Sequence, residues 1–141
     1  MMGHPVVVDA SVGVKWFRVE GASSQAWELL ERHAEGEVDI HVPTQRMGEI
    51  LAVVARSSGT SGAIRAWVAL DMARLEQHGF SDALLHEARR QTDALGCVFY
   101  DALVPALAVL LGADLYSGDK GAHGAFPGVK LLFDDRGSIS N

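Results

Sequence analysis

The sequence contains a single cysteine, Cys97, among its 141 residues. One thiol excludes an internal disulfide and a zinc site built from cysteines, and it fits a reducing, cytoplasmic setting. Small or apolar neighbours, Gly96, Val98 and Phe99, flank this cysteine. We therefore expect Cys97 to be a buried core residue rather than a nucleophile.

Basic residues are also scarce. The chain has 12 lysines and arginines against 18 acidic residues, which gives a net charge of −6 and an isoelectric point near 5.4. A protein that binds nucleic acid through bulk electrostatics is usually basic. Either the partner is not a nucleic acid, or part of the negative charge has a local function.

Long apolar runs are missing as well. The longest, residues 102–112, is interrupted by Pro105 and is too short to span a bilayer. The opening stretch "MMGHPVVVDAS" has no basic region before its apolar run, so we expect no signal peptide. No repeat or linker divides the chain. Its length and its 48% hydrophobic content predict one domain over residues 1–141 with a sizeable core.

Short β-rich runs alternate with longer helical patterns along the chain. The expected strands cover residues 5–9, 40–43, 114–117 and 128–133, with a short one within 75–80. The expected helices cover residues 23–34, 45–56, 60–75, 82–95 and 101–111, with a break at the "SSGTSG" stretch, 57–62. This alternation predicts an α/β fold, a three-layer sandwich in which helices flank a mainly parallel sheet.

Four acidic residues are expected at one edge of that sheet. In a right-handed βαβ unit, the start of the helix and the end of the following strand lie at the same edge, so Asp101 and Asp119 can meet. Asp9 ends the first strand, and Glu49 lies in the first turns of the helix after the second. These acids converge where open α/β sheets bind ligands.

Such a cluster of carboxylates requires a compensating cation, because like charges raise one another's pKa. Ligands that are all oxygen point to Mg²⁺ or Mn²⁺ rather than zinc. A metal of this kind polarises a phosphoryl oxygen and activates water. The expected reaction class is metal-dependent phosphodiester hydrolysis.

Four stretches, "VVVDASVGVKWF", "GEILAVV", "YDALVPALAVLLGADLYSGDKG" and "GVKLL", resemble the PIN-domain ribonucleases, with the VapC-type toxins of toxin–antitoxin systems as the most similar subgroup. The resemblance runs from about Val6 to Leu132 and agrees with the fold expected above. It implies cleavage of single-stranded or structured RNA, often tRNA or rRNA. It also implies a homodimer that a VapB-type antitoxin protein neutralises.

The resemblance also implies roles for individual residues. The family's four acidic positions fall on Asp9, Glu49, Asp101 and Asp119, of which Asp9, Asp101 and Asp119 would hold the metal. Glu49 would orient or deprotonate the attacking water. The small hydroxyl residues that support the family's site correspond to Ser11 and Ser117.

Basic residues near these motifs are candidates for RNA phosphate contacts, against the alternative that they are ordinary surface charges: Lys15, Arg18, Arg46 and Lys120. Many relatives carry arginines after the fourth acid, where this chain has Lys120, Gly121 and His123. His123 is a further candidate for RNA contact, whereas the six histidines as a group show no metal-ligand spacing. Asp134 and Asp135 are interpreted as a solvated turn.

Two other interpretations remain open. Asp101 alone could be an acid that the helix dipole favours, and Asp119 alone could be a turn residue. A separate hypothesis is that the chain is a catalytically weak PIN-fold module that binds a protein partner, although the presence of all four acids argues against it. A phosphoaspartate receiver or phosphatase fits poorly, because Asp9 has no second acid two residues later.

Overall fold

The structure of the protein, a computed structural model, describes residues 3–17 and 24–132. The strands are β1 (His4–Val8), β2 (Val38–Pro43), β3 (Glu76–His78), β4 (Asp114–Ser117) and β5 (Lys130–Leu131). The helices are α1 (Ala10–Gly13), a 3₁₀ turn η1 (Val14–Phe17), α2 (Ser24–Ala34), α3 (Thr44–Met72), α4 (Asp82–Leu95), α5 (Phe99–Leu111) and α6 (Lys120–His123).

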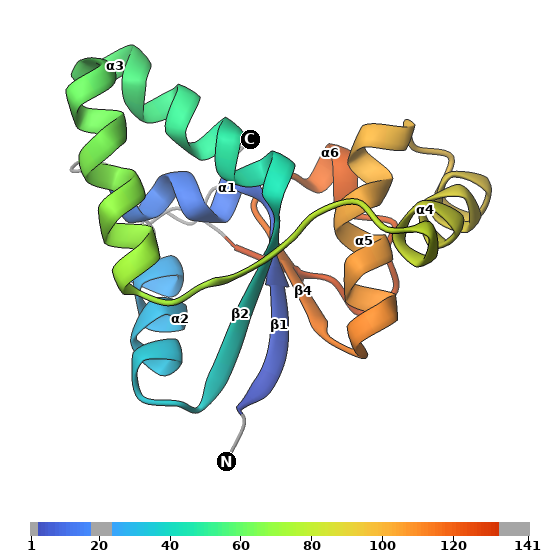
Figure 1. The fold of residues 1–141 in the computed structure, drawn as a ribbon. Helices are drawn as coiled ribbons and strands as arrows, with labels where there is room; N and C mark the ends of the chain where they lie inside the picture. Colours follow the sequence, from blue (N-terminus) through green and yellow to red (C-terminus); the bar gives the residue numbers. More distant parts are fainter. Residues whose placement is uncertain (1–2, 18–23, 133–141) are drawn as a thin grey trace.

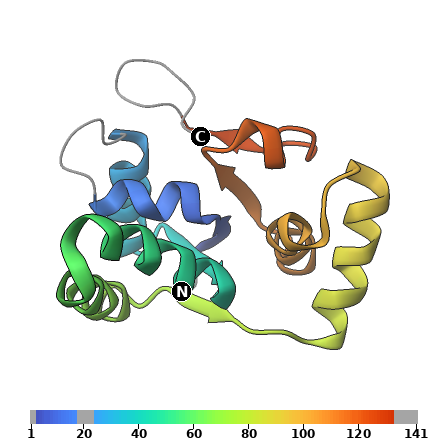
Figure 2. The ribbon, with the colours of Figure 1, turned by 90° about the horizontal axis from the view of Figure 1, so that it is seen from above.

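The five strands form one sheet in the order β3-β2-β1-β4-β5, and every neighbouring pair is parallel. The first strand is central, because Val7 pairs with His41 of β2 on one side and with Leu115 of β4 on the other. Helices lie on both sides of this sheet (Figures 1 and 2). The predicted three-layer α/β sandwich is confirmed.

Alternation along β1 separates two hydrophobic cores. Val6 and Val8 point into a core shared with α1, η1, α2 and α3, whereas Val7 points into a core shared with α4 and α5. All three valines are at most 1% exposed. A strand buried on both faces explains the continuous β-branched run at the start of the sequence.

The predicted break between the two middle helices is a single kinked residue. Gly59 adopts φ 70° and ψ 179° inside α3, and the two arms of the helix meet there at an angle (Figure 1). A positive φ favours glycine, which lacks a Cβ. The expected loop over residues 57–62 is therefore wrong, although the change of direction falls inside it.

The two helices on the other face match their predicted bounds closely. Ser81 caps α4 by accepting a hydrogen bond from the Leu84 N–H, and Gly96 ends this helix in the left-handed conformation. Helix α5 begins two residues earlier than predicted and continues through the buried Pro105. Among the described residues no single helix is long and apolar enough to cross a membrane; α4 and α5 meet those conditions only together, with a bend of 110° between them.

Some local elements differ from the sequence prediction. The short α1, η1 and α6 were not predicted, because each holds only four residues and shows no clear periodicity. The last strand is shorter than expected, and Phe133 lies outside the described residues together with Asp134 and Asp135. Cys97 is partly buried against the α4–α5 core, and burial raises the pKa of its thiol.

Candidate active site

Asp9 is the most buried acid at the carboxyl edge of the sheet, at 4% exposed. It follows β1 and caps α1, where its Oδ1 accepts hydrogen bonds from the Ser11 hydroxyl and, at 3.1 Å, from the Ser11 N–H. Its Oδ2 accepts a bond from the Ser117 hydroxyl at 3.1 Å and lies 3.0 Å from Nδ1 of His123.

Two opposing effects set the pKa of Asp9. Burial raises it, but hydrogen bonding and charge from His123, together with the hydroxyls of Ser11 and Ser117, outweigh burial and hold the pKa below its ordinary value. Asp9 is therefore a carboxylate at neutral pH. Ser11 and Ser117 lie beside it as the sequence analysis expected.

His123 has a structural position that the sequence did not indicate. It is 2% exposed, its Nδ1 lies 2.9 Å from the Ser117 hydroxyl, and its Nε2 lies 3.3 Å from the carbonyl oxygen of Asp101. The ring thus joins α6 to the ends of β1 and β4 and to the start of α5. Its place four residues after Asp119 was the available signal, but a buried hydrogen-bonded role requires the folded positions of all three segments.

Arg46 lies between two of the predicted acids. Its side chain is 7% exposed, with Nη1 2.7 Å from Oε1 of Glu49 and Nη2 3.5 Å from Oδ1 of Asp101. Nη2 also donates to the carbonyl oxygen of Tyr100 at 2.9 Å, and the guanidinium stacks over the Tyr100 ring at 4.1 Å. In this arrangement the charge of Arg46 compensates carboxylates of the protein. The sequence analysis considered it a candidate RNA phosphate contact or an ordinary surface charge, and its burial shows that it is not an ordinary surface charge.

Asp119 reaches the same edge from β4. It caps α6, where its Oδ1 accepts a hydrogen bond from the Ala122 N–H at 3.0 Å. The preceding Gly118 donates its N–H to the Ser11 hydroxyl at 2.7 Å. A Cβ on Gly118 would lie 3.2 Å from that hydroxyl oxygen and 3.3 Å from Cε of Lys15, so the backbone approaches α1 more closely than a side chain would comfortably allow.

These acids line one pocket of about 270 Å³. Its lining residues are Asp9, Ala10, Ser11, Val14, Lys15, Arg46, Glu49, Val53, Asp101, Asp119 and His123. We call this set the acidic pocket. The fold thus brings together all four acids that the sequence placed at the carboxyl edge.

The predicted RNA contacts fall in different places. Lys15 is fully buried and lines the acidic pocket, as Arg46 does. Lys120 is exposed on α6 and is not among the lining residues. Arg18 lies outside the described residues.

The donor set of the acidic pocket fits a hard divalent cation, since four carboxylates supply oxygen ligands alone. The acids line one pocket, but among the described residues no three of them hold their ligand atoms within 4.8 Å of one another. Within the described residues, the group of three whose ligand atoms all lie within 4.8 Å of one another is His41, Glu76 and His78, and none of these lines the acidic pocket. The guanidinium of Arg46 contacts both Glu49 and Asp101. It therefore already compensates part of the negative charge that a bound metal would also compensate.

Comparison with known proteins was made by family model, by sequence and by structure. Residues 6–125 match the model of the PIN domain family. A search of curated protein sequences gives no match. The solved structures that share the fold include a toxin–antitoxin complex from Klebsiella pneumoniae, 15% identical, with a TM-score of 0.69 over 88% of this chain and 94% of that one.

Two further structures are similar over nearly their whole length. VapC20 of Mycobacterium tuberculosis, a toxin that cleaves the sarcin-ricin loop, is 15% identical with a TM-score of 0.65, over 90% of this chain and 98% of that one. VapBC2 of Rickettsia felis, bound to a DNA fragment from its promoter, is 17% identical with a TM-score of 0.64, over 89% and 96%. At these identities the likeness shows a common fold.

Proposed function

Because this chain belongs to the PIN domain family, we propose that it is a Mg²⁺- or Mn²⁺-dependent endoribonuclease and the toxin of a toxin–antitoxin pair. The observation that carries the proposal is the acidic pocket, in which Asp9, Glu49, Asp101 and Asp119 line one cavity. PIN domains are generally nucleases, which supports the reaction class. The structural neighbours include an RNA-cleaving toxin, which supports RNA as the substrate.

Each acid has a role that follows from its position. Asp9, Asp101 and Asp119 would hold the cation, and of these Asp9 is fixed most firmly, by the two serines and His123. When bound, the metal would polarise a phosphoryl oxygen of the substrate and lower the pKa of water. Glu49, whose side chain is 39% exposed and lines the same pocket, would orient the attacking water and accept its proton.

Arg46 and His123 position these acids. Arg46 fixes Glu49 relative to Asp101 through its two terminal nitrogens, and His123 fixes Asp9 relative to Ser117. The buried Lys15 adds a second cation to the lining of the acidic pocket. Part of the negative charge at this edge therefore has local partners, which reduces the repulsion that an RNA phosphate would meet there.

The protein partners of the proposal are a VapB-type antitoxin and a second copy of the chain. Complexes of toxins with antitoxins among the structural neighbours support the antitoxin as a partner.

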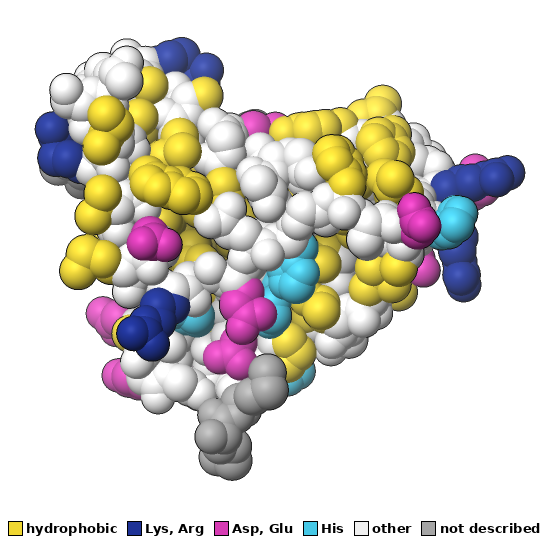
Figure 3. Space-filling model, in the orientation of Figure 1, with side chains coloured by type: hydrophobic (Ala, Val, Ile, Leu, Met, Phe, Trp, Pro, Cys, Tyr) yellow, Lys and Arg dark blue, Asp and Glu magenta, His cyan; other side chains and the backbone are white. Residues whose placement is uncertain are grey.

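Hydrophobic side chains gather over α3 on the face drawn in Figure 3. The second arm of this helix exposes Ile64, Trp67, Val68 and Met72, the last at 76%, and such surface supports a protein–protein contact. Light scattering of the purified chain, alone and with a co-expressed antitoxin, measures both associations.

The test of the enzyme is RNA cleavage by the purified chain with Mg²⁺, with Mn²⁺ and with a chelator, compared with Asp9→Asn. We expect cleavage that requires the metal and falls by about a thousandfold or more in the variant, because several kcal/mol of transition-state stabilisation depend on the cation. Asp71→Asn, an exposed acid on α3, is the matched control and should retain full activity. Sequencing the 5′ ends of the products identifies the cut site.

Two results would contradict the proposal. One is cleavage by Asp9→Asn at the wild-type rate. The other is calorimetric titration in which the folded wild-type chain takes up neither Mg²⁺ nor Mn²⁺ at the acidic pocket, which is the behaviour of a PIN-fold module that only binds a protein partner.

A further inference from the structure

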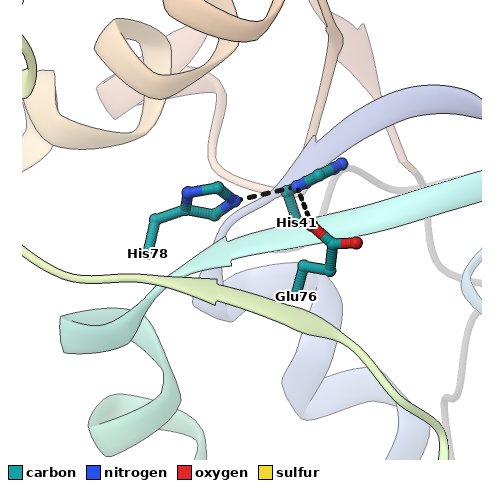
Figure 4. A group of neighbouring side chains, drawn as sticks. All are labelled: His41, Glu76 and His78. Atoms are coloured by element: carbon teal, nitrogen blue, oxygen red, sulfur yellow. Dashed lines mark hydrogen bonds and ion pairs between the residues drawn. The ribbon is translucent and has the colours of Figure 1, made fainter.

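A second group of metal-ligand side chains lies on a different part of the sheet. His41 belongs to β2, and Glu76 and His78 belong to the edge strand β3. Figure 4 shows the three side chains pointing toward one another from the two strands. We call them the edge cluster. The sequence analysis found no metal-ligand spacing among the histidines, and the fold brings His41 and His78 together although they are far apart in sequence.

Parallel pairing explains why the edge cluster forms. His41 is in register with Glu76, so their side chains leave the sheet on the same face, and His78 follows Glu76 by two residues and shares that face. It is the face of Val7, which pairs with His41 and points into the α4–α5 core. The two strands are separated in sequence by the thirty-two residues 44–75, which include α3, so no local motif indicates the cluster.

The three ligand atoms of the edge cluster already lie close to one another. Nδ1 of His41 lies 2.8 Å from Nε2 of His78 and 3.4 Å from Oε2 of Glu76, and all three ligand atoms lie within 4.8 Å of one another. The two rings lean together, with centroids 5.1 Å apart. At 2.8 Å one proton lies between the two nitrogens, so one ring donates and the other accepts.

From this geometry we propose that the edge cluster is a binding site for Zn²⁺, held by the two imidazole nitrogens and the Glu76 carboxylate. Two nitrogens and one oxygen suit zinc and not the hard cation expected in the acidic pocket. Tetrahedral zinc with bonds of about 2.0–2.1 Å holds two nitrogen ligands about 3.3 Å apart, so the His41–His78 pair needs to open by only about half an ångström.

Burial supports the assignment. His41 is 6% exposed, so its ring is held inside the fold with its Nδ1 directed at the other two side chains of the cluster. The side chain of Glu76 is 56% exposed, which leaves a route for the ion and room for a water at the fourth position. Histidine and acidic side chains accordingly appear together near the middle of the face drawn in Figure 3.

A nearby histidine shows what a purely structural ring looks like in this fold. His33 packs beside β2, where its Nδ1 accepts a hydrogen bond from the Ile40 N–H at 3.1 Å. Its Nε2 lies 2.8 Å from the carbonyl oxygen of Ala73. Both of its nitrogens are used by backbone groups. In the edge cluster, by contrast, one nitrogen of each ring, Nδ1 of His41 and Nε2 of His78, faces other metal-ligand side chains.

Zinc bound at the edge cluster would hold the short edge strand β3 against β2. β3 has three residues and only one neighbouring strand, β2. In the chain, β3 connects the second arm of α3 to α4, and α4 packs on α5, the helix that carries Asp101. A ligand that binds only the folded chain raises its stability by mass action.

The test is a Zn²⁺ titration of the metal-free full chain in competition with a chromophoric chelator, together with thermal unfolding. We expect one zinc site, a higher melting temperature with zinc, and no displacement by excess Mg²⁺. Co²⁺ in place of Zn²⁺ should give the visible absorption of a low-coordinate site with nitrogen ligands. Asp9→Asn, which alters the acidic pocket, should keep all of these signals.

Two variants locate the site. Glu76→Gln and His78→Gln change side chains that are exposed or half-exposed, so the fold does not depend on them. Loss of an outer partner of a metal ligand already costs about 10–100-fold in affinity, so each variant should bind zinc at least about tenfold more weakly. His86→Gln, an exposed histidine on α4, is the matched control and should bind zinc as the wild type does.

Several results would overturn the assignment. Absence of zinc binding to the wild type is one, and equal affinity of the wild type, Glu76→Gln and His78→Gln is another. Zinc binding that disappears in Asp9→Asn and persists in the two edge variants would place the ion in the acidic pocket instead. None of these readouts depends on RNA cleavage, so the zinc site and the proposed nuclease activity are tested independently.

Discussion

The acidic pocket and the edge cluster are two places where the same sheet gathers charged or metal-ligand side chains, and they are built differently. The acidic pocket collects acids that follow strands or begin helices; Arg46 compensates two of them, and His123 lies 3.0 Å from a third, Asp9. The edge cluster arises within two paired strands, and its three side chains include no lysine or arginine.

This difference bears on what each place can bind. In the acidic pocket, protein cations already neutralise part of the carboxylate charge, so an added cation must compete with the guanidinium of Arg46. In the edge cluster a single proton between two rings must move aside, which costs little at neutral pH because a neutral imidazole can carry its proton on either nitrogen. The acidic pocket therefore favours a hard ion that binds together with the substrate. The edge cluster favours a soft or borderline ion that stays bound to the protein.

The largest expected effect separates the two sites by activity. Asp101→Asn should lower RNA cleavage by about a thousandfold or more, since it removes a proposed metal ligand. The same variant should keep the rise in melting temperature that Zn²⁺ produces, because the edge cluster is untouched. Cleavage assays and thermal unfolding on one preparation measure both quantities.

Asp93→Asn, an exposed acid on α4, is the control for that experiment and should change neither quantity. The comparison of the two sites would fail if Asp101→Asn abolished cleavage and zinc stabilisation together while still folding. That outcome would mean that the two regions bind one ion or unfold as one unit.

The next effect tests whether Arg46 acts as the built-in counter-ion of the acidic pocket. Arg46→Met removes a buried cation that pairs with Glu49 and Asp101, and it should lower the free energy of unfolding without metal by about 3–5 kcal/mol. Added Mg²⁺ should restore more stability to the variant than it adds to the wild type, because the acids then lack their protein partner. Chemical denaturation with and without Mg²⁺ measures the difference.

Arg56→Met provides the control on the same helix, because Arg56 is exposed. It should change stability by less than about 0.5 kcal/mol and leave the response to Mg²⁺ unaltered. If Arg46→Met and the wild type gained the same stability from Mg²⁺, Arg46 would be a packing residue and not a competitor of the metal.

The sequence predicted the acidic pocket well because its determinants are local. Asp9, Asp101 and Asp119 each follow a strand or begin a helix, and those elements have clear patterns, such as the valines of β1 and the apolar run of α5. Strand-to-helix connections in parallel sheets all emerge at one edge. Predicting the elements therefore predicted the convergence of the acids.

The roles of Arg46, His123 and the edge cluster could not be predicted in the same way. The orientation of Arg46 depends on how closely α5 approaches α3, which places the carbonyl oxygen of Tyr100 within 2.9 Å of the guanidinium. The edge cluster depends on the register between β2 and β3. Register between strands that are far apart in sequence is fixed by packing of the whole core and leaves no spacing rule in a single sequence.

A smaller effect compares the partly buried His33 with the histidines of the edge cluster. His33→Gln should lower the free energy of unfolding by about 1–3 kcal/mol, since it leaves the Ile40 N–H or the Ala73 carbonyl without its partner. It should not change the affinity for Zn²⁺. Chemical denaturation and the chelator competition measure these two values, and a loss of zinc affinity equal to that of His78→Gln would show that His33 belongs to the site.

The smallest expected effect concerns the rim of the acidic pocket. Lys120 is exposed on α6, directly after Asp119, and is the one predicted RNA contact that the structure leaves at the described surface. Lys120→Gln should weaken RNA binding by a few fold and lower the salt dependence of the binding constant by about one unit of slope, because one phosphate contact is lost. Binding measured over a series of salt concentrations gives both values.

The control for this experiment is Lys130→Gln, since Lys130 is also exposed but lies on β5 beside Tyr116 and outside the acidic pocket. It should leave the slope unchanged. An equal decrease in slope for both variants would mean that RNA contacts the surface through its overall charge. With a net charge of −6 that mode of binding is weak, so a decrease confined to Lys120→Gln is the result that ties RNA to the edge of the sheet where the four acids meet.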